Sequence, residues 1–292
     1  MALCITSVEN HREREKGFIV YPVFSRRSGG LSLGINLYPG KKYCPFNCPY
    51  CEVFPFANDA VFSLEQMEKD LRCAVNDALE QNAPISDICF SGNGEPSLSP
   101  FFGDALKIAE NIRAQIAPPE AQNAAHGTSQ GAAQNAPQKT QLVVITNGAG
   151  LLQPPVFSML QAASGQTDIW LKLDAGTPGW YQKINRSSLP FEKLIGKIKE
   201  FTACASVTIQ TMLCAINGSP PPDEEAQAWE SLVCELAAAG SIRKVQIYGK
   251  ARPAPEDPTA SPLPSESLEE RAASLRCKFV ERGISTPVDV YV

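Results

Sequence analysis

The strongest constraint in the sequence is the run at 42–51, KYCPFNCPYC, which spaces three cysteines as C-x3-C-x2-C. Three thiolates so close together can hold one inorganic centre, and short cysteine spacings with proline among them are typical of iron–sulfur loops. A [4Fe–4S] cube needs four ligands, so three cysteines leave one iron open. Metal sites bind and activate substrates at such open positions. The run therefore predicts a cluster loop with one iron free for a ligand from outside the protein.

Composition limits the classes of protein that the chain can belong to. Its 292 residues suffice for one large domain, and a net charge of −5 gives no overall attraction for nucleic acid. No apolar run is long enough to span a bilayer, and the charged stretch at 11–16 does not suit a secretory signal, so we expect a cytoplasmic protein. Ten cysteines then indicate reduced thiols and a metal site.

The cysteines outside the run are expected to be small buried hydrophobic residues. They are Cys4, Cys73, Cys89, Cys204, Cys214, Cys234 and Cys277.

Apolar segments with strand and helix periodicity alternate along the chain. Strands are expected at 31–37, 87–91, 142–148, 169–174, 207–213, 244–248 and 287–292, and helices at 63–81, 101–115, 154–163, 190–203, 223–239 and 267–282. This alternation predicts parallel strands joined by right-handed crossovers.

Two segments flank a core of 31–250, and a third is inserted in it. Residues 1–30 are expected to be an irregular N-terminal extension, and 251–292 a C-terminal helix and strand packing on the core. Residues 116–139 are rich in alanine, glutamine, asparagine, proline and glycine without an apolar period, which predicts an exposed insertion. His126, inside it, is expected to be solvated.

One face of the predicted sheet is polar in strand after strand. Its residues are Ser32, Asn36, Asp87, Ser91, Lys172, Asp174, Thr208, Gln210, Gln246 and Tyr248. A closed barrel of this kind is filled with bulky apolar side chains, so a polar face favours an open barrel that holds solvent, cofactor or substrate. An ordinary open sheet with polar residues near its strand ends is the alternative.

Chemistry in parallel α/β folds sits at the carboxyl ends of the strands. The cysteine loop follows the first strand there, and the turn Gly92-Asn93-Gly94-Glu95 follows the second. Its glycines allow close approach of a ligand, and Glu95 could accept a hydrogen bond from an ammonium group. The turn alone could also be a simple strand-to-helix connection.

Further polar residues are expected at this rim, and two of them, with two others, are where we expect the substrate. The rim residues are Thr146, Asn147, Lys172, Asp174, Gln210 and Tyr248. The expected substrate-lining residues are Gln210, Gln246, Tyr248 and Arg252.

The C-x3-C-x2-C run with an aromatic residue before its last cysteine, followed by a strand that ends in Gly-Glu-Pro, resembles the radical S-adenosylmethionine superfamily over about 31–250. Segments 25–36, 91–97 and 171–176 resemble more loosely the bacterial radical proteins grouped with the wyosine synthases of tRNA. The resemblance implies a partial (β/α)6 TIM-type barrel, open, with a [4Fe–4S] cluster at the carboxyl ends of the strands.

The same resemblance implies site residues. Cys44, Cys48 and Cys51 would bind the cluster, S-adenosylmethionine would chelate the fourth iron, and Tyr50 would lie beside the adenine. The turn from Gly92 to Glu95 would meet the methionyl ammonium.

Of the rim residues, Thr146, Asn147 and Lys172 match positions that contact the methionyl carboxylate or the ribose, although some relatives have a small hydroxyl residue in place of the lysine. Asp174 and Gln210 are further candidates for cofactor binding.

The implied activity is reductive cleavage of S-adenosylmethionine to a 5′-deoxyadenosyl radical, which abstracts hydrogen from an unidentified substrate. The cofactors carry this chemistry. An external reductant of the flavodoxin or ferredoxin type is implied as a partner.

Three alternatives remain open. A structural zinc loop would need a fourth ligand, and no histidine lies near. A non-catalytic redox or regulatory iron–sulfur protein would not need the glycine turn. Modification of tRNA is suggested by the looser resemblance and opposed by the acidic balance. Only Cys4 precedes the run, so we expect a single cluster acting on a small molecule, peptide or protein.

Overall fold

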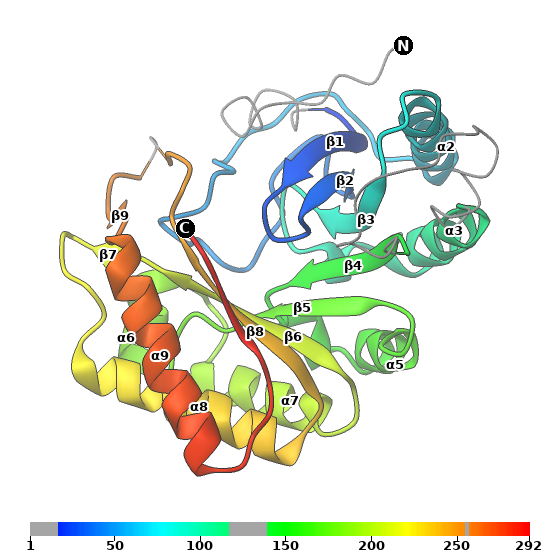
Figure 1. Ribbon diagram of the computed structural model, residues 1–292. Coiled ribbons are helices and arrows are strands. Elements are labelled where there is room, and N and C mark those ends of the chain that lie inside the picture. Colours follow the sequence, from blue (N-terminus) through cyan, green and yellow to red (C-terminus); the bar gives the residue numbers. More distant parts are fainter. Residues whose placement is uncertain (1–16, 117–138, 255–256) are drawn as a thin grey trace. The chain divides into compact units, whose positions relative to one another are not determined.

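A computed structural model describes residues 17–116, 139–254 and 257–292 of the chain (Figure 1). Its main sheet has eight strands in the order β1-β2-β3-β4-β5-β6-β8-β10. The pairs β2–β3, β5–β6, β6–β8 and β8–β10 are parallel, and β1–β2 is antiparallel. Strands and helices alternate along the chain, as the sequence predicts.

The chain divides into two compact units, which are described separately. Unit 1 comprises Met1–Lys41 and Ala57–Val143, and unit 2 comprises Lys42–Phe56 and Val144–Val292. The cysteine loop, Lys42–Phe56, thus belongs to the unit formed by the C-terminal half of the chain. Its two flanking residues, Lys41 and Ala57, form an antiparallel bridge in unit 1.

Unit 1 contains strands β1 to β3 and two long helices. Its elements are β1 (Val20–Ser25), β2 (Gly30–Asn36), α2 (Leu64–Glu80), β3 (Ile85–Ser91), the 3-10 turn η2 (Pro96–Leu98) and α3 (Phe102–Gln115). The helix α2 begins where the sequence predicts, because the Ser63 hydroxyl accepts a hydrogen bond from the Gln66 amide at 3.3 Å. Strand β4 (Gln141–Thr146) begins in unit 1 and ends in unit 2.

Unit 2 contains the remaining elements. They are η3 (Ala149–Leu152), α5 (Pro154–Ala163), β5 (Asp168–Lys172), α6 (Pro178–Ile184), α7 (Phe191–Thr202), β6 (Val207–Leu213), β7 (Ala215–Ile216), α8 (Asp223–Ala239), β8 (Ile242–Gly249), β9 (Ala260–Ser261), α9 (Ser265–Glu281) and β10 (Val288–Tyr291). Helix α8 packs against α7 and α9, and α9 packs on β8 and β10 (Figure 1). The C-terminal helix and strand are therefore part of this unit's core.

The prediction for the N-terminal region is wrong in part, and one short helix was not predicted. Residues 1–30 are not wholly irregular, because Val20–Ser25 forms an edge strand whose Tyr21 and Val23 are buried. Pro22 lacks a donor for the ladder but is tolerated at a sheet edge. The short helix α6 was not predicted, although Thr177 caps it and Pro178 occupies its first position.

The predicted burial of the scattered cysteines holds for only some of them. Cys89, Cys214 and Cys234 are buried, whereas Cys73, Cys204 and Cys277 are exposed. The exposed three lie on or just after amphipathic helices, where a polar face accepts a small thiol. Cys4, the insertion around His126 and most of residues 116–139 lie outside the described residues.

The polar face predicted from the strands is present within each unit. In unit 1, Ser32 is in register with Asp87 and donates a hydrogen bond to it. In unit 2, Lys172, Gln210 and Gln246 occupy one row across β5, β6 and β8. Gln210 donates a hydrogen bond to Gln246, whereas Lys172 binds Tyr248 and Asp174, and all of these side chains are largely buried, so the row is a polar interior layer. In the described part of the chain, no helix is both long and apolar enough to cross a membrane.

A close backbone contact fixes the loop after β5 against α8. A Cβ atom added at Gly176 would lie 2.1 Å from the Trp229 nitrogen, so only glycine fits without a backbone shift. The adjacent carboxylate of Glu225, on α8, accepts hydrogen bonds from the Gly176 amide and from the Thr177 hydroxyl. The distance between this turn and the first part of α8 is therefore fixed.

We predict that Gly176→Ala lowers the free energy of unfolding by about 3 kcal/mol, because the new methyl group forces the turn away from α8. The measurement is the urea unfolding midpoint. Gly179→Ala is the matched control, since no heavy atom lies within 4 Å of its added Cβ and the site is helical. It should be neutral or stabilising by up to about 1 kcal/mol. Equal stability of the two variants would contradict the close contact.

A buried carboxylate joins α8 to α9. Glu230 has a side chain only 2% exposed and pairs with Arg271 at 2.7 Å and Lys278 at 2.6 Å. Burial alone would raise the pKa of Glu230, but hydrogen bonds from Lys278, Arg271 and Ser274 outweigh it and hold the pKa below its usual value. Its stabilising contribution is therefore complete above the ordinary glutamate pKa of about 4.3 and disappears as pH falls through the lower folded-state value.

We predict that Glu230→Gln lowers the free energy of unfolding by about 1.5–3 kcal/mol at pH 7. The difference in unfolding free energy between the variant and the unmodified protein should become smaller below about pH 4. Unfolding in urea at a series of pH values measures this. Glu235→Gln, on the same helix, removes a surface pair whose carboxylate is 55% exposed, and should cost under about 1 kcal/mol. If the difference in unfolding free energy between Glu230→Gln and the unmodified protein stays constant down to pH 3, the charge of the Glu230 carboxylate does not contribute to stability.

Candidate functional site

The cysteine loop is anchored in unit 2 by the end of α6. The Phe46 ring packs edge-on against the Tyr181 ring, with centroids 5.7 Å apart. The Asn47 amide donates a hydrogen bond to the Asn185 carbonyl at 2.9 Å. A loop without regular structure is thus fixed by an aromatic contact and a backbone hydrogen bond.

All three cysteine sulfurs are half-buried, and each accepts a hydrogen bond from a side-chain nitrogen. Asn147 Nδ2 lies 3.4 Å from Cys44 Sγ, Asn185 Nδ2 lies 3.5 Å from Cys48 Sγ, and Lys42 Nζ lies 3.6 Å from Cys51 Sγ. These nitrogens come from the turn after β4, the end of α6 and the loop itself. The surroundings of the sulfurs are therefore built from three separate parts of unit 2.

Asp174, just after β5, connects the loop to the sheet. Its side chain is 1% exposed, and Oδ1 accepts a hydrogen bond from the Met212 amide at 2.9 Å. Its Oδ2 accepts from the Tyr50 hydroxyl and from Asn185 Nδ2 at 2.9 Å, with Lys172 Nζ at 3.6 Å. A buried charge with this many donors is well compensated, and it places the predicted residues Tyr50, Lys172 and Asp174 in one cluster.

Lys172 brings a positive charge into this cluster. Its ammonium donates to the Tyr248 hydroxyl and lies 4.9 Å from the centre of the Tyr50 ring, which is cation–π distance. Burial alone would lower the pKa of Lys172, but the Asp174 carboxylate and Tyr248 outweigh it and raise the pKa. Burial and then Asp174 raise the pKa of Tyr50. At neutral pH the cluster therefore contains a charged Lys172 and a neutral Tyr50.

The electrostatics of Cys48 depend on the same carboxylate. Burial, followed by the negative charges of Asp174 and Cys51, raises the pKa of Cys48 to about 11, although the Asn185 hydrogen bond opposes the shift. Without a metal this thiol keeps its proton at neutral pH. Thiols bind metals as thiolates, so loading the site releases protons.

Two further predicted residues, Thr146 and Asn147, shape the turn after β4. The Thr146 hydroxyl accepts from the Gly148 amide at 3.1 Å, and Asn147 Oδ1 accepts from the Ala149 amide at 2.9 Å. Gly148 has a φ of +81°. Asn147 is thereby turned so that its amide nitrogen faces Cys44.

Gln210 lies deeper in the sheet, in the row of Lys172. It is fully buried and donates a hydrogen bond to Gln246 Oε1 at 2.7 Å. Of the expected substrate-lining residues, Gln210 pairs with Gln246, Tyr248 binds Lys172, and Arg252 pairs with Glu52 at 2.6 Å.

The glycine turn belongs to unit 1 and is ordered there by Asn36. Asn36 Oδ1 accepts from the amides of Asn93 and Tyr38, both at 3.1 Å. Gly92 has a φ of +105°, and a Cβ there would lie 2.8 Å from Asn36 Oδ1. Glu95 is buried, and its Oε1 accepts from the Ser97 amide at 3.1 Å, capping the turn η2.

Sequence reasoning missed several residues that support the loop. Asn185 stands 137 positions from Cys48, and no local pattern marks it. Two ion pairs hold the segment after β8 against the site. Asp257 pairs with Arg186, the neighbour of Asn185, and Arg252 pairs with Glu52 of the cysteine loop. Lys42 lies inside the cysteine run, and of these contacts only the one between Lys42 and Cys51 joins residues that are close in the sequence.

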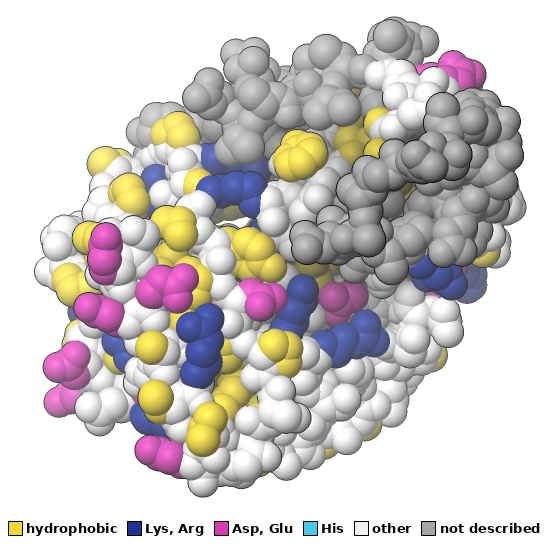
Figure 2. Space-filling view, viewed as in Figure 1, with side chains coloured by type: hydrophobic (Ala, Val, Ile, Leu, Met, Phe, Trp, Pro, Cys, Tyr) yellow, Lys and Arg dark blue, Asp and Glu magenta, His cyan; other side chains and the backbone are white. Residues whose placement is uncertain are grey.

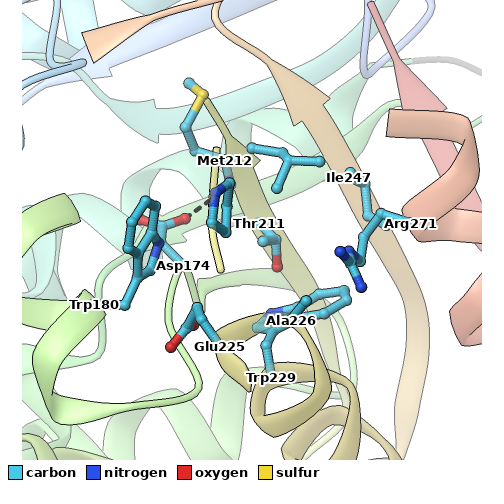
Figure 3. Close-up of a pocket in the computed structure, with 11 residues that line it drawn as sticks. Asp174, Trp180, Thr211, Met212, Glu225, Ala226, Trp229, Ile247 and Arg271 are labelled. Atoms are coloured by element: carbon cyan, nitrogen blue, oxygen red, sulfur yellow. Dashed lines mark hydrogen bonds between the residues drawn. The ribbon is translucent and has the colours of Figure 1, made fainter. Parts of the chain in front are cut away.

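A pocket adjoins the inner part of this cluster (Figure 3). Asp174 and Trp180 lie on one side of it, and Arg271 of α9 lies on the other. Glu225, Trp229 and Met212 also line it. Its walls are the outer surface of β6 and the helices α8 and α9, so it reaches Asp174 from the helix side of the sheet.

The donor set suits an iron–sulfur cluster better than a single ion. In the described ranges, no three Cys, His, Asp or Glu side chains converge closely enough to hold one metal ion. The cysteines of a cluster each bind a different iron, so they need not converge on a point. The nine cysteines within those ranges are all free thiols.

Comparisons with known proteins give relatives of modest similarity. The chain matches no family model. It is 28% identical over 201 residues to a UPF0026 protein of Helicobacter pylori strain J99, covering 66% of this chain and 53% of that protein. It is 26% identical over 245 residues to a UPF0026 protein of Synechocystis sp., covering 80% of this chain and 76% of that one. The chain thus spans about half the length of the Helicobacter relative.

Solved structures decide the fold. SuiB of Streptococcus suis bound to S-adenosylmethionine superposes with a TM-score of 0.62 at 13% identity, covering 91% of this chain and 52% of SuiB. A radical SAM methyltransferase from Sphaerobacter thermophilus superposes with a TM-score of 0.61 at 16% identity, covering 92% of this chain and 68% of the methyltransferase. The chain has the fold of the radical S-adenosylmethionine enzymes. The fold class predicted from the sequence is confirmed, and with it the resemblance at the level of the fold.

One more neighbour bears on the looser resemblance. TYW1 with a lysine-pyruvate adduct bound gives a TM-score of 0.51 at 14% identity, covering 84% of this chain and 72% of TYW1. At this identity the likeness concerns the fold alone.

We predict that Asp174→Asn costs about 3–5 kcal/mol of unfolding free energy, because it leaves the buried Lys172 charge without its carboxylate. Urea unfolding measures the loss. Asp289→Asn, whose carboxylate is 44% exposed and 3.8 Å from Lys244, is the matched control and should cost less than about 1 kcal/mol. If both variants lose equally little, Asp174 does not hold the loop.

Proposed function

We propose that this chain is a radical S-adenosylmethionine enzyme that binds a single [4Fe–4S] cluster through Cys44, Cys48 and Cys51. The observation that carries the proposal is the loop itself, in which three half-buried sulfurs each accept a side-chain hydrogen bond in a protein of this fold. When bound, the cluster and S-adenosylmethionine supply one-electron chemistry that cleaves the sulfonium and ends in abstraction of hydrogen from a substrate.

The residues of unit 2 provide a charged and partly buried wall for the cofactor. Tyr50 offers an aromatic face for the adenine, and its neighbour Lys172 offers a cation for the methionyl carboxylate or the ribose. Asp174 orients both of them through its hydrogen bond and ion pair. Thr146 and Asn147 shape the adjoining turn, and Gln210 continues the polar row beside Lys172 on β6.

For the ammonium group of the cofactor we propose, from the sequence resemblance, the turn from Gly92 to Glu95 in unit 1. The backbone of Gly92, Asn93 and Gly94 carries carbonyl groups that accept hydrogen bonds, and Glu95 adds a buried carboxylate. Asn36 holds this turn in shape, so its role is positioning. A methyl group at position 92 would displace Asn36, and we therefore assign the glycine there to the shape of the turn.

The substrate that we favour is a small molecule, a peptide or a protein. SuiB has been crystallised with its precursor peptide, which supports a peptide. Modification of tRNA is the second candidate, supported by the looser sequence resemblance of segments 25–36, 91–97 and 171–176. Against it stand the net charge of −5 and the visible face in Figure 2, where Lys and Arg side chains are interspersed with Asp and Glu.

A cluster of this kind needs an outside electron, so we propose a reductant of the flavodoxin or ferredoxin type as a partner. We also propose a cytoplasmic location. Free thiols among the described cysteines agree with a reducing compartment.

We predict that anaerobically reconstituted protein holds about four irons per chain and forms 5′-deoxyadenosine from S-adenosylmethionine under reductant. Cys48→Ala should lose both the cluster absorbance and the product, because one iron loses its thiolate. The matched control is Cys73→Ala, which changes an exposed thiol on α2 and should retain both.

Each other outcome has a definite meaning. A Cys48→Ala protein that still cleaves S-adenosylmethionine would overturn the assignment. Full iron content without any 5′-deoxyadenosine would favour the non-catalytic redox protein, and about eight irons per chain would overturn the single cluster.

A further inference from the structure

We propose that Lys42, Asn147 and Asn185 are positioning residues that raise the reduction potential of the cluster, each by donating an N–H to one cysteine sulfur. The inference rests on the proposed function, since it requires the cluster to be bound. It assigns to these three residues a role beyond holding the loop.

The contacts are distributed one to a sulfur. The donor–sulfur distances of 3.4, 3.5 and 3.6 Å, for Asn147, Asn185 and Lys42, all fall in a narrow range typical of hydrogen bonds to sulfur. The donors are not sequence neighbours, so their arrival at three different sulfurs does not follow from the local geometry of one loop. A purely structural tether would not need a donor at every ligand.

Each donor is itself held in a defined orientation. Asn147 Oδ1 is occupied by the Ala149 amide at 2.9 Å, so its nitrogen must face Cys44. Asn185 Nδ2 also donates to Asp174 Oδ2 at 2.9 Å, which fixes its amide in the same way. Lys42 Nζ donates to the Val53 carbonyl at 2.8 Å. Both asparagines are buried, so water does not compete for their N–H groups.

The chemistry of such contacts is general. A donor to a ligating sulfur withdraws electron density from it and stabilises the reduced, more negative state of the cluster. Lys42 carries a full charge and should have the largest effect. Asn147 contributes only a dipole. Asn185 is shared with the Asp174 carboxylate, whose negative charge opposes it, and should have the smallest effect.

The test is a redox titration of the reconstituted, full-length protein, followed by EPR of the reduced cluster. At a fixed solution potential, Lys42→Met should lower the ratio of reduced to oxidised cluster about tenfold, which corresponds to about 59 mV for one electron. Lys42→Arg keeps the charge and the N–H groups and should change the ratio less than about threefold. Lys183→Met is the matched control, because it removes an exposed lysine of α6 and should leave the ratio unchanged.

The second variant is Asn147→Leu, with an expected loss of about threefold. This variant tests the proposal if Lys42→Met fails to fold or to hold iron. An unchanged ratio of reduced to oxidised cluster in Asn147→Leu would then overturn the proposal. Loaded variants of Lys42 and Asn147 that titrate like the unmodified protein would overturn it too, as would equal shifts in Lys42→Met and Lys183→Met. If the unmodified protein itself binds no iron, the proposed function fails instead, and iron content distinguishes the two results.

Discussion

The site in unit 2 depends on one buried carboxylate. Asp174 joins the cysteine loop, through Tyr50, to the end of α6, through Asn185, and to the backbone of β6, through Met212. Moving a charge into the interior is costly unless hydrogen-bond donors surround it. Here the donors come from the cysteine loop, the end of α6 and β6, so the carboxylate joins these three parts. The cost of burying the charge is therefore offset by contacts that give an irregular loop a defined position.

The positive charge of Lys172 follows from the same carboxylate. Asp174 favours the charged form of the lysine although burial opposes it. The rings of Tyr50 and Tyr248 lie at cation–π distance from the ammonium, and the Tyr248 hydroxyl accepts a hydrogen bond from it. A cation held in this way is available to an anionic group of a ligand at little cost in side-chain entropy. The polar row of Lys172, Gln210 and Gln246 continues this layer into the sheet.

Much of this arrangement could be predicted from the sequence, and the remainder could not for a physical reason. Strand and helix periodicity located the main elements, and cysteine spacing located the loop, because both signals lie within a few residues. The edge strand β1 went unnoticed because Pro22 interrupts its pattern, and α6 because two turns are too short for a period. Asn185 and Asp257 act through contacts with residues distant in sequence, which no local pattern records.

The bridge between Lys41 and Ala57 closes the base of the cysteine loop, whereas two of the three side-chain partners of its sulfurs, Asn147 and Asn185, come from much later in the chain. During synthesis the three thiols are therefore made early and remain without Asn147 and Asn185 until the ribosome has passed those residues. Their complete surroundings exist only once α6 has formed and folded back on the loop. An oxidant that reaches the nascent chain before residue 185 has been made therefore meets Cys44 and Cys48 without both of their hydrogen-bonding partners in place.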